Sequence, residues 1–172
     1  MKRLILCRHA KSSWATPGQA DIDRPLNERG LRNAPEMGRR LRKRGETPVL
    51  MVSSPARRAL ATARLMADEL GIAREDIVVE DALYEASVAT WLTAIAALPA
   101  GADTVLMVGH NPTLTELANL LCRDVRIDNI PTCGVLRLDY ELRSWAAVPR
   151  TRPADWSFDY PKRPSAEERA FH

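Results

Sequence analysis

The chain has 172 residues, of which 45% are hydrophobic and 27% charged, and a net charge of +3 at pH 7. This length and balance predict one soluble globular domain. No apolar run approaches the roughly 20 residues that span a bilayer, and the apolar start at residues 4–7 is too short for a signal peptide. We therefore expect a cytoplasmic protein with no membrane partner.

In chain order, apolar runs and turn residues predict alternating strands and helices. We expect a strand at residues 2–7, a loop at 10–25, a helix from 27 to 44, a strand at 49–53, a helix at 55–70, a strand at 77–80, a helix at 87–98, a strand at 103–108, a helix at 112–122, and late strands at 135–140 and 145–148. Pro35 leaves open a division of the first helix into two short ones. The apolar strands lack polar alternation, which predicts an α/β fold with an open, mainly parallel sheet and helices on both faces in three layers.

The composition changes near residue 149. We expect a single domain over residues 1–148 and a proline-rich tail over residues 149–172 that does not easily form a helix or a strand. Three aromatic side chains can dock this tail on the domain: Trp156, Phe158 and Tyr160.

The three cysteines, Cys7, Cys122 and Cys133, are scattered and form no Cys-x-x-Cys pair, which argues against a disulfide framework and a structural zinc site. The excess of basic residues has two interpretations: an arginine-rich solvated surface, or a field that attracts anionic substrates. No basic stretch is interleaved with aromatic side chains, so no nucleic-acid partner is expected.

Reactive residues follow three of the predicted strands. The first strand ends in Arg8-His9, the second in Ser53-Ser54-Pro55 with Arg57 and Arg58 just beyond, and the strand at 103–108 in Gly109-His110-Asn111-Pro112. In an open parallel sheet, ligands bind beyond the carboxyl ends of the strands. We therefore expect the three clusters to lie at one edge of the sheet.

These residue types suit phosphoryl chemistry. An arginine fork matches phosphate oxygens in bidentate geometry and stays charged at any useful pH. A neutral imidazole is a competent nucleophile towards phosphorus. Each residue alone has an ordinary structural interpretation, a loop histidine or a surface charge, and only their joint placement favours a phosphate site. Ser13, in the loop after the first strand, is a further candidate phosphate ligand.

Rival motifs fit less well. A cysteine-based phosphatase needs an arginine six positions after its cysteine, but Ser13 stands six after Cys7. The chain has no glycine-rich phosphate loop or dinucleotide fingerprint. The pair Asp21 and Asp23 resembles an aspartyl-phosphatase pair but lies in a loop. A metal site around His9 lacks a His-x-x-x-His pair or an acidic cluster, so no metal or other cofactor is expected.

Together these residues resemble the histidine phosphatase superfamily. Its three signatures, Arg-His-Gly, Ser-Ser-Pro-x-x-Arg-Ala-x-Gln-Thr and Gly-His, are matched by the following residues: Arg8-His9-Ala10, then Ser53, Ser54, Pro55, Arg58, Ala59 and Thr62, then Gly109-His110. Ala10 and Ala61 depart from the usual glycine and glutamine. The short length, Asp23-Arg24-Pro25-Leu26 and Leu83-Tyr84-Glu85-Ala86 are similar to the small SixA-type branch, the phosphohistidine phosphatases.

The resemblance implies a phosphoglycerate-mutase-like fold and a metal-independent phosphatase. In that mechanism His9 becomes phosphorylated, Arg8, Arg58 and His110 hold the phosphoryl group, and water then releases it. Glu85 is the first candidate for the proton donor, with Asp21 or Asp23 as the second; a solvated loop carboxylate is the alternative interpretation of Glu85. An imidazole leaving group, with a pKa near 6.5 against about 10 for a phenol, needs less help from an acid.

The expected substrate is a phosphorylated protein or a small phosphate ester. The loop at residues 10–25 and the stretch at 82–101 are short, which favours an open site and a protein substrate such as a phosphohistidine. Two alternatives remain: a module that binds phospho-ligands with little catalysis, and a mutase-like phosphotransferase with an enclosed pocket.

Overall fold

The structure is a computed structural model that describes residues 1–124 and 126–163. Its sheet has the order β3-β2-β4-β1-β5-β6. The strands are β1 (Lys2–Arg8), β2 (Leu50–Ser53), β3 (Val78–Val79), β4 (Thr104–Gly109), β5 (Val135–Tyr140) and β6 (Asp155–Asp159). The first four strands of the order run parallel, and β5 and β6 are antiparallel to their neighbours. The predicted α/β class with a mainly parallel sheet is confirmed.

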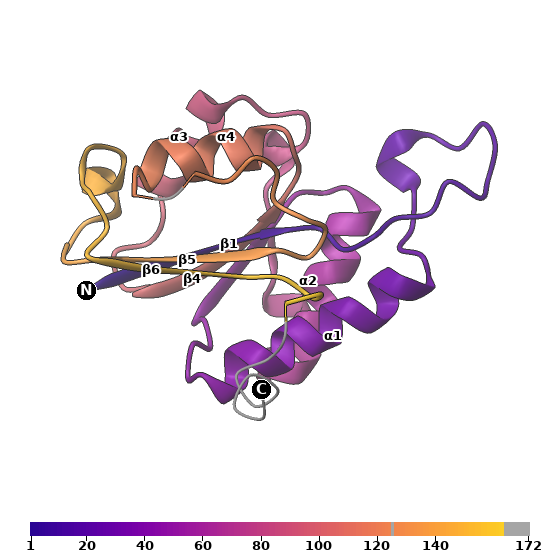
Figure 1. Cartoon of the computed structure of the whole chain (residues 1–172), viewed down its shortest axis with the longest axis horizontal. Helices are drawn as coiled ribbons and strands as arrows, with labels where there is room; N and C mark the ends of the chain where they lie inside the picture. The colour runs from indigo at the N-terminus through magenta and orange to yellow at the C-terminus, as the bar shows by residue number, and fades with distance from the viewer. Residues whose placement is uncertain (125, 164–172) are drawn as a thin grey trace.

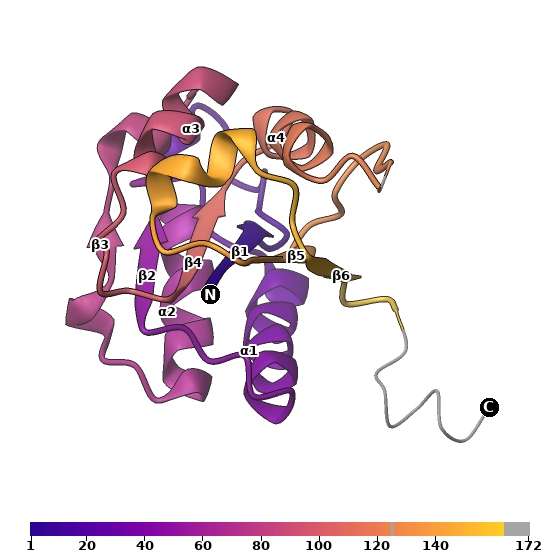
Figure 2. The same cartoon turned by 90° about the vertical axis from the view of Figure 1, so that its left-hand side faces the viewer.

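Helices cover both faces of the sheet. Figure 1 shows α1 (Glu28–Lys43) and α2 (Arg57–Leu70) on one face, and α3 (Val88–Ala96) and α4 (Thr113–Leu121) on the other. The same layers are visible after a turn of 90° (Figure 2). Four short 3₁₀ helices occur in the connections: Asp21–Asp23, Arg74–Asp76, Asp81–Leu83 and Trp145–Arg150.

The central strand β1 contributes to both layers of the core. Successive side chains of a strand point to opposite faces, so Leu4 and Leu6 join the core under α3 and α4, while Ile5 and Cys7 join the core against α1 and α2. All four side chains are fully buried. A strand buried on both faces in this way fixes the position of its last residue, Arg8, and of His9, which follows it.

The ends of the first two long helices follow from local chemistry. The side chain of Asn27 accepts a hydrogen bond from the Gly30 N–H and caps α1. Gly71 ends α2 with a φ of 71°, a left-handed conformation that glycine adopts without strain. Pro35 lies inside α1, which continues as one helix because its buried face, including Met37 and Leu41, packs against α2.

Two predictions near the C-terminal end are wrong. Residues 145–148 belong to the 3₁₀ helix at Trp145–Arg150 and not to a strand; Ser144 caps it, and Trp145 donates from Nε1 to the Ala102 carbonyl at 2.8 Å. Part of the predicted tail forms β6, because the stretch between Pro153 and Pro161 is free of proline.

Strand β6 attaches the segment that was predicted as a proline-rich tail to the sheet. Trp156 pairs with Leu138 and Phe158 with Leu136 across β5, and both aromatic side chains pack on the core, in keeping with the predicted docking. The division of the chain at residue 148 stays a prediction, and residues 164–172 lie outside the described part. Within the described part, no helix is both long and apolar enough to cross a bilayer.

Candidate active site

The three predicted clusters meet at the carboxyl edge of the sheet. Arg8 is the register partner of Gly109, and the His9 N–H donates to the Gly109 carbonyl at 3.0 Å. On the other side of β4, the Ser54 N–H donates to the Val108 carbonyl at 3.1 Å. The rings of His9 and His110 are consequently 5.2 Å apart between centroids.

Close packing between β4 and α3 explains why the residue before His110 is a glycine, Gly109. A β-carbon at Gly109 would lie 2.2 Å from the indole ring of Trp91, which is itself 1% exposed. No side chain larger than hydrogen fits there without moving the indole. The backbone of β4 therefore approaches α3 closely, and His110 leaves the strand in a fixed position.

His9 is held as a neutral imidazole with one free nitrogen. Its Nδ1 lies 2.7 Å from the Ala10 carbonyl oxygen. A carbonyl oxygen can only accept, so this contact requires the hydrogen on Nδ1 and leaves a lone pair on Nε2. Burial lowers the pKa of His9 to about 3, helped by the positive charges of Arg58 and Arg8. The ring is 7% exposed, and its Nε2 is suited to attack an electrophile at neutral pH.

His110 is oriented by a serine from the second cluster. Its Nε2 lies 2.7 Å from Oγ of Ser54, whose oxygen also accepts from the Ala56 N–H at 3.1 Å. The Ser54 hydroxyl can donate its own hydrogen to Nε2 of His110, and in that arrangement the neutral ring carries its hydrogen on Nδ1. Burial lowers the pKa of His110 to about 4.

In both predicted arginines, Arg8 and Arg58, Nη atoms are hydrogen-bonded while Nε has no partner. Nη1 of Arg8 donates to the Ile130 carbonyl at 2.9 Å, and the two Nη atoms of Arg58 donate to the carbonyl and carboxylate of Asp21 at 2.7 and 3.0 Å. The Nε atoms of Arg8 and Arg58 are buried without a hydrogen-bond partner among the described residues. Arg57, beside Arg58, is exposed.

Unused donors are concentrated in this cluster. In the described chain, five buried side-chain polar atoms have no partner, and three of them are Nε of Arg8, Nε of Arg58 and Nδ1 of His110. Buried donors without a partner are costly, and each one calls for an explanation. Arg8, Arg58 and His110 are the groups whose charges act on His9, and an anion beside His9 would supply the acceptors that their N–H groups lack.

A cavity of about 370 Å³ opens beside this cluster. Arg58 and His110 line it, together with Tyr84, Glu85 and Trp91 among others. The predicted proton donor Glu85 is exposed at its rim, with a φ of 53°. Its role as donor stays a prediction.

The other two candidate carboxylates differ from each other. Asp21 contacts Arg58 directly, and a hydrogen bond from Tyr84, together with those from Arg24 and Arg58, lowers its pKa to about 2. Asp23 is exposed, and the described contacts include none for its carboxylate. Ser13 stays a prediction too: its hydroxyl accepts from the Ala15 N–H at 3.0 Å, within its own loop.

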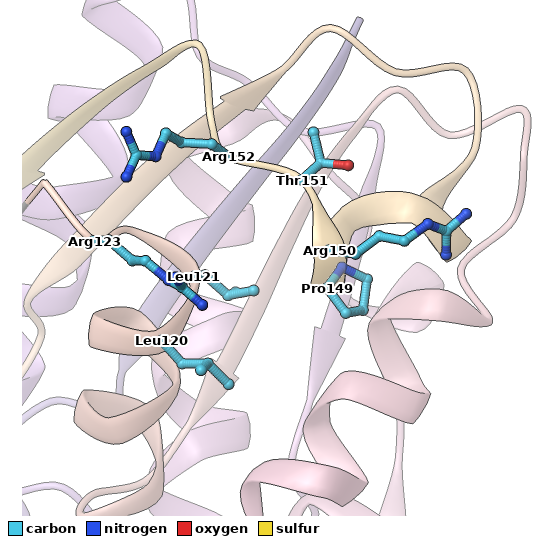
Figure 3. Close-up of a pocket in the computed structure, with 7 residues that line it drawn as sticks. All are labelled: Leu120, Leu121, Arg123, Pro149, Arg150, Thr151 and Arg152. Carbon is cyan, nitrogen blue, oxygen red and sulfur yellow. The ribbon is translucent and has the colours of Figure 1, made fainter.

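A second hollow, of about 210 Å³, lies away from the cluster, at the end of α4. Its lining residues are Leu120, Leu121, Arg123, Pro149, Arg150, Thr151 and Arg152. Figure 3 shows the guanidinium groups of its three arginines pointing in different directions. All three arginines are exposed, so water satisfies their donors, and nothing there corresponds to the buried donors around His9.

The described residues contain no group of three or more histidine, cysteine, aspartate or glutamate side chains placed to hold a metal ion. The unpartnered arginine atoms near His9 are N–H donors, whereas a cation would need lone pairs.

Comparison with known proteins agrees with this geometry. A sequence profile of the histidine phosphatase superfamily (branch 1) matches residues 4–96, more than half of the chain and the segment that holds Arg8, His9 and Arg58. The chain belongs to this superfamily. Among solved structures, a putative phosphohistidine phosphatase SixA from Agrobacterium tumefaciens is 33% identical, with a TM-score of 0.74, covering 91% of this chain and 97% of that one. The predicted SixA-type resemblance is confirmed.

Two more distant phosphatases share the fold. A protein histidine phosphatase SixA in complex with tungstate has a TM-score of 0.74 at 19% identity, covering 92% of this chain and 94% of that one. A mycobacterial glucosyl-3-phosphoglycerate phosphatase has a TM-score of 0.67 at 19% identity, covering 93% and 98%. By sequence, an uncharacterised chloroplastic protein of Arabidopsis thaliana is 29% identical over 92% of this chain and 76% of its own length.

Three contacts of the site were not predicted, although the sequence analysis named the segments they come from: Ser54 with His110, Tyr84 as a cavity wall, and Arg24 with Asp21. Ser54 could be placed near the site because it follows a strand. The others come from segments whose approach to the site depends on the fold of distant loops.

Proposed function

We propose that the protein is a phosphatase that transfers a phosphoryl group to Nε2 of His9 and then to water. The observation that carries this proposal is the Nδ1 contact of His9 with the Ala10 carbonyl, which leaves Nε2 nucleophilic next to three unused buried donors. Membership of a family of phosphatases supports the same reaction class.

In the first step, the Nε2 lone pair attacks phosphorus and the bond from phosphorus to the leaving group breaks. Arg8, Arg58 and His110 donate to the three equatorial oxygens, where negative charge is greatest in the transition state. The leaving group takes a proton from Glu85 or from solvent. In the second step, water attacks phosphorus, the N–P bond breaks, inorganic phosphate leaves, and His9 regains its lone pair.

The proposed substrates are a phosphohistidine on a protein and small phosphomonoesters. The leaving nitrogen of phosphohistidine has a low basicity, so the reaction does not require a strongly held acid, and the candidate donor Glu85 is exposed at the cavity rim. We also propose that the reaction needs no metal, because the phosphoryl charge is met by arginine and histidine donors.

The test is a comparison of the wild-type protein with His9→Ala on a protein phosphorylated at histidine, on phosphotyrosine peptides and on small aryl phosphates. We expect wild-type turnover that a metal chelator leaves intact, an acid-labile phosphoryl adduct on His9, and no turnover by the variant. Binding without phosphate release would instead identify a phospho-ligand module. Transfer between phosphoglycerates without net hydrolysis would identify a mutase.

A further inference from the structure

Asp21 is a meeting point of donors from three segments of the chain. Its Oδ2 accepts from Nη2 of Arg58 on α2 at 3.0 Å and from the Tyr84 hydroxyl at 2.6 Å, and its Oδ1 accepts from Nε of Arg24 at 3.0 Å. Its carbonyl oxygen accepts from Nη1 of Arg58 at 2.7 Å. Figure 1 shows that the chain between β1 and α1, which carries Asp21, stands out from the body of the protein.

These contacts determine how Arg58 presents its remaining donors. A guanidinium group is planar, so two bonds to one partner fix both its plane and its rotation within that plane. The Arg58 side chain is 7% exposed, so solvent has little access to its Nη atoms as a replacement for Asp21. With Nη1 and Nη2 engaged by Asp21, the unpartnered Nε is held in one orientation.

The same contacts make Asp21 unsuitable as a proton donor. Every group that faces its carboxylate in the described structure is itself a donor: Arg24, Arg58 and Tyr84. The ionised carboxylate is the form that accepts most strongly from the two guanidinium groups, which have no lone pair that could accept an O–H. The carboxylate is therefore held in its ionised form, as an acceptor.

We propose that Asp21 is a positioning residue that holds Arg58 for oxyanion binding. Tyr84 and Arg24 hold Asp21 in turn, so the projecting loop and the segment around Tyr84 take part in shaping the phosphate site. This inference rests on the proposed function only in assigning Arg58 to the phosphoryl group, and oxyanion binding can be measured without turnover.

The test measures tungstate binding by calorimetry, and KM and kcat for aryl phosphates with leaving groups of graded basicity, in Asp21→Ala and Asp21→Asn. For Asp21→Ala we expect tungstate affinity to fall and KM to rise by about 10-fold to 100-fold, the range for a hydrogen bond to a charged group. Asp21→Asn keeps an oxygen acceptor and should recover part of this loss. The dependence of kcat on leaving-group basicity should not change.

The matched control is Asp68→Ala. Asp68 makes a comparable two-point contact with Arg74, at 2.9 and 2.6 Å, on the same helix but ten residues beyond Arg58, about 15 Å along the axis. It should leave tungstate affinity unchanged.

Two results would overturn the proposal: an unaltered tungstate affinity in Asp21→Ala, or a loss of kcat that grows with leaving-group basicity, which marks a proton donor. If Asp21→Ala does not fold, the test rests on Asp21→Asn. Its tungstate affinity should then fall by about 3-fold to 10-fold, as expected for a weakened hydrogen bond to a charged group. A wild-type protein that binds tungstate but releases no phosphate would contradict the proposed function and leave the role of Asp21 open to the same measurement.

Discussion

Two groups of arginines in this fold have similarly low exposure but different hydrogen-bond partners. At the carboxyl edge, Arg8 and Arg58 each keep a buried Nε without a partner. Beside β6, all three guanidinium nitrogens of Arg40 and of Arg137 are engaged. Arg40 donates to Glu36, to Asp159 and to the carbonyls of Tyr160 and Pro161.

Arg137 also uses all three guanidinium nitrogens: it donates to Ser157, Asp139 and Asp155. Arg40 and Arg137 are 10% and 12% exposed at the side chain, close to the 7% of Arg58. Burial alone therefore does not separate the two groups. Unused donors mark the arginines that are placed for a ligand, and saturated donors mark those that hold the protein together.

The largest effect is expected where donors are unused. Arg58→Ala removes one donor group aimed at the proposed transition state and should lower kcat for an aryl phosphate by about 10² to 10³. Arg58→Lys should recover little, because an ammonium group does not reproduce the fixed fork. Steady-state kinetics measure this, and a loss below 10-fold would contradict the distinction between the two groups.

The opposite result is expected beside β6. Arg40→Ala removes one of the two arginine contacts of Asp159, which keeps Arg44 at 3.0 Å, and it removes the hydrogen bonds to the carbonyls of Tyr160 and Pro161. The free energy of unfolding should therefore fall by about 2 kcal/mol, the range for hydrogen bonds to a charged group. The kcat of the folded fraction should stay unchanged. Urea unfolding followed by circular dichroism measures the free energy of unfolding. A large loss of kcat without a loss of stability would mean that arginines with and without unused donors do not differ in role.

The histidines provide a pH test of the catalytic edge. Burial lowers the pKa values of His9 and His110 to about 3 and about 4, so between the unfolded value of about 6.5 and these values the unfolded chain binds more protons. The free energy of unfolding should therefore fall as pH decreases through this range, by about 1.4 kcal/mol per pH unit for each histidine. Below the folded values no further loss arises from them.

Replacing His9 by glutamine should make this part of the pH profile shallower. The same pKa values predict that kcat/KM retains its value at pH 5, with an acid limb near pH 3 to 4 instead of 6.5. An acid limb near 6.5 would show that the buried neutral imidazole is not the reactive form.

The smallest effect is expected at a fully solvated arginine. The guanidinium group of Arg74 is hydrogen-bonded only to Asp68 in the described structure, and its side chain is 51% exposed. Arg74→Ala should therefore leave both the free energy of unfolding and kcat close to their wild-type values. A loss comparable to that of Arg40→Ala would mean that the number of partners does not determine the contribution of an arginine.

The sequence predicted the parts of the site that lie at strand ends. Arg8, His9 and His110 lie at or just after the ends of strands whose apolar runs are readable locally, and parallel strands bring their carboxyl ends together. Arg58 was preferred to Arg57 because the resemblance to the superfamily signature places its arginine three positions after Pro55. These positions depend on short-range pattern and one general rule of sheet geometry.

The partners of these residues were not predictable, because they come from distant loops. Arg8 donates to the Ile130 carbonyl, and Tyr84 donates to Asp21. The residues of each pair are far apart in the chain, so no local sequence pattern predicts the contact. The same limit explains the error at Trp145, whose apolar surroundings suit a strand but whose indole N–H is taken by Ala102. β6 was missed because flanking prolines dominated its composition.

The projecting loop contains one more feature with a practical consequence. Trp14 is 76% exposed, and the guanidinium carbon of Arg24 lies 3.5 Å from the centroid of its ring. Trp91 and Trp145 are 1% exposed and Trp156 is partly buried, so a water-soluble quencher such as iodide should act most strongly on Trp14. Because Arg24 connects this ring to Asp21, and Asp21 to Arg58, the intrinsic fluorescence of the protein should report on the phosphate site without any added label.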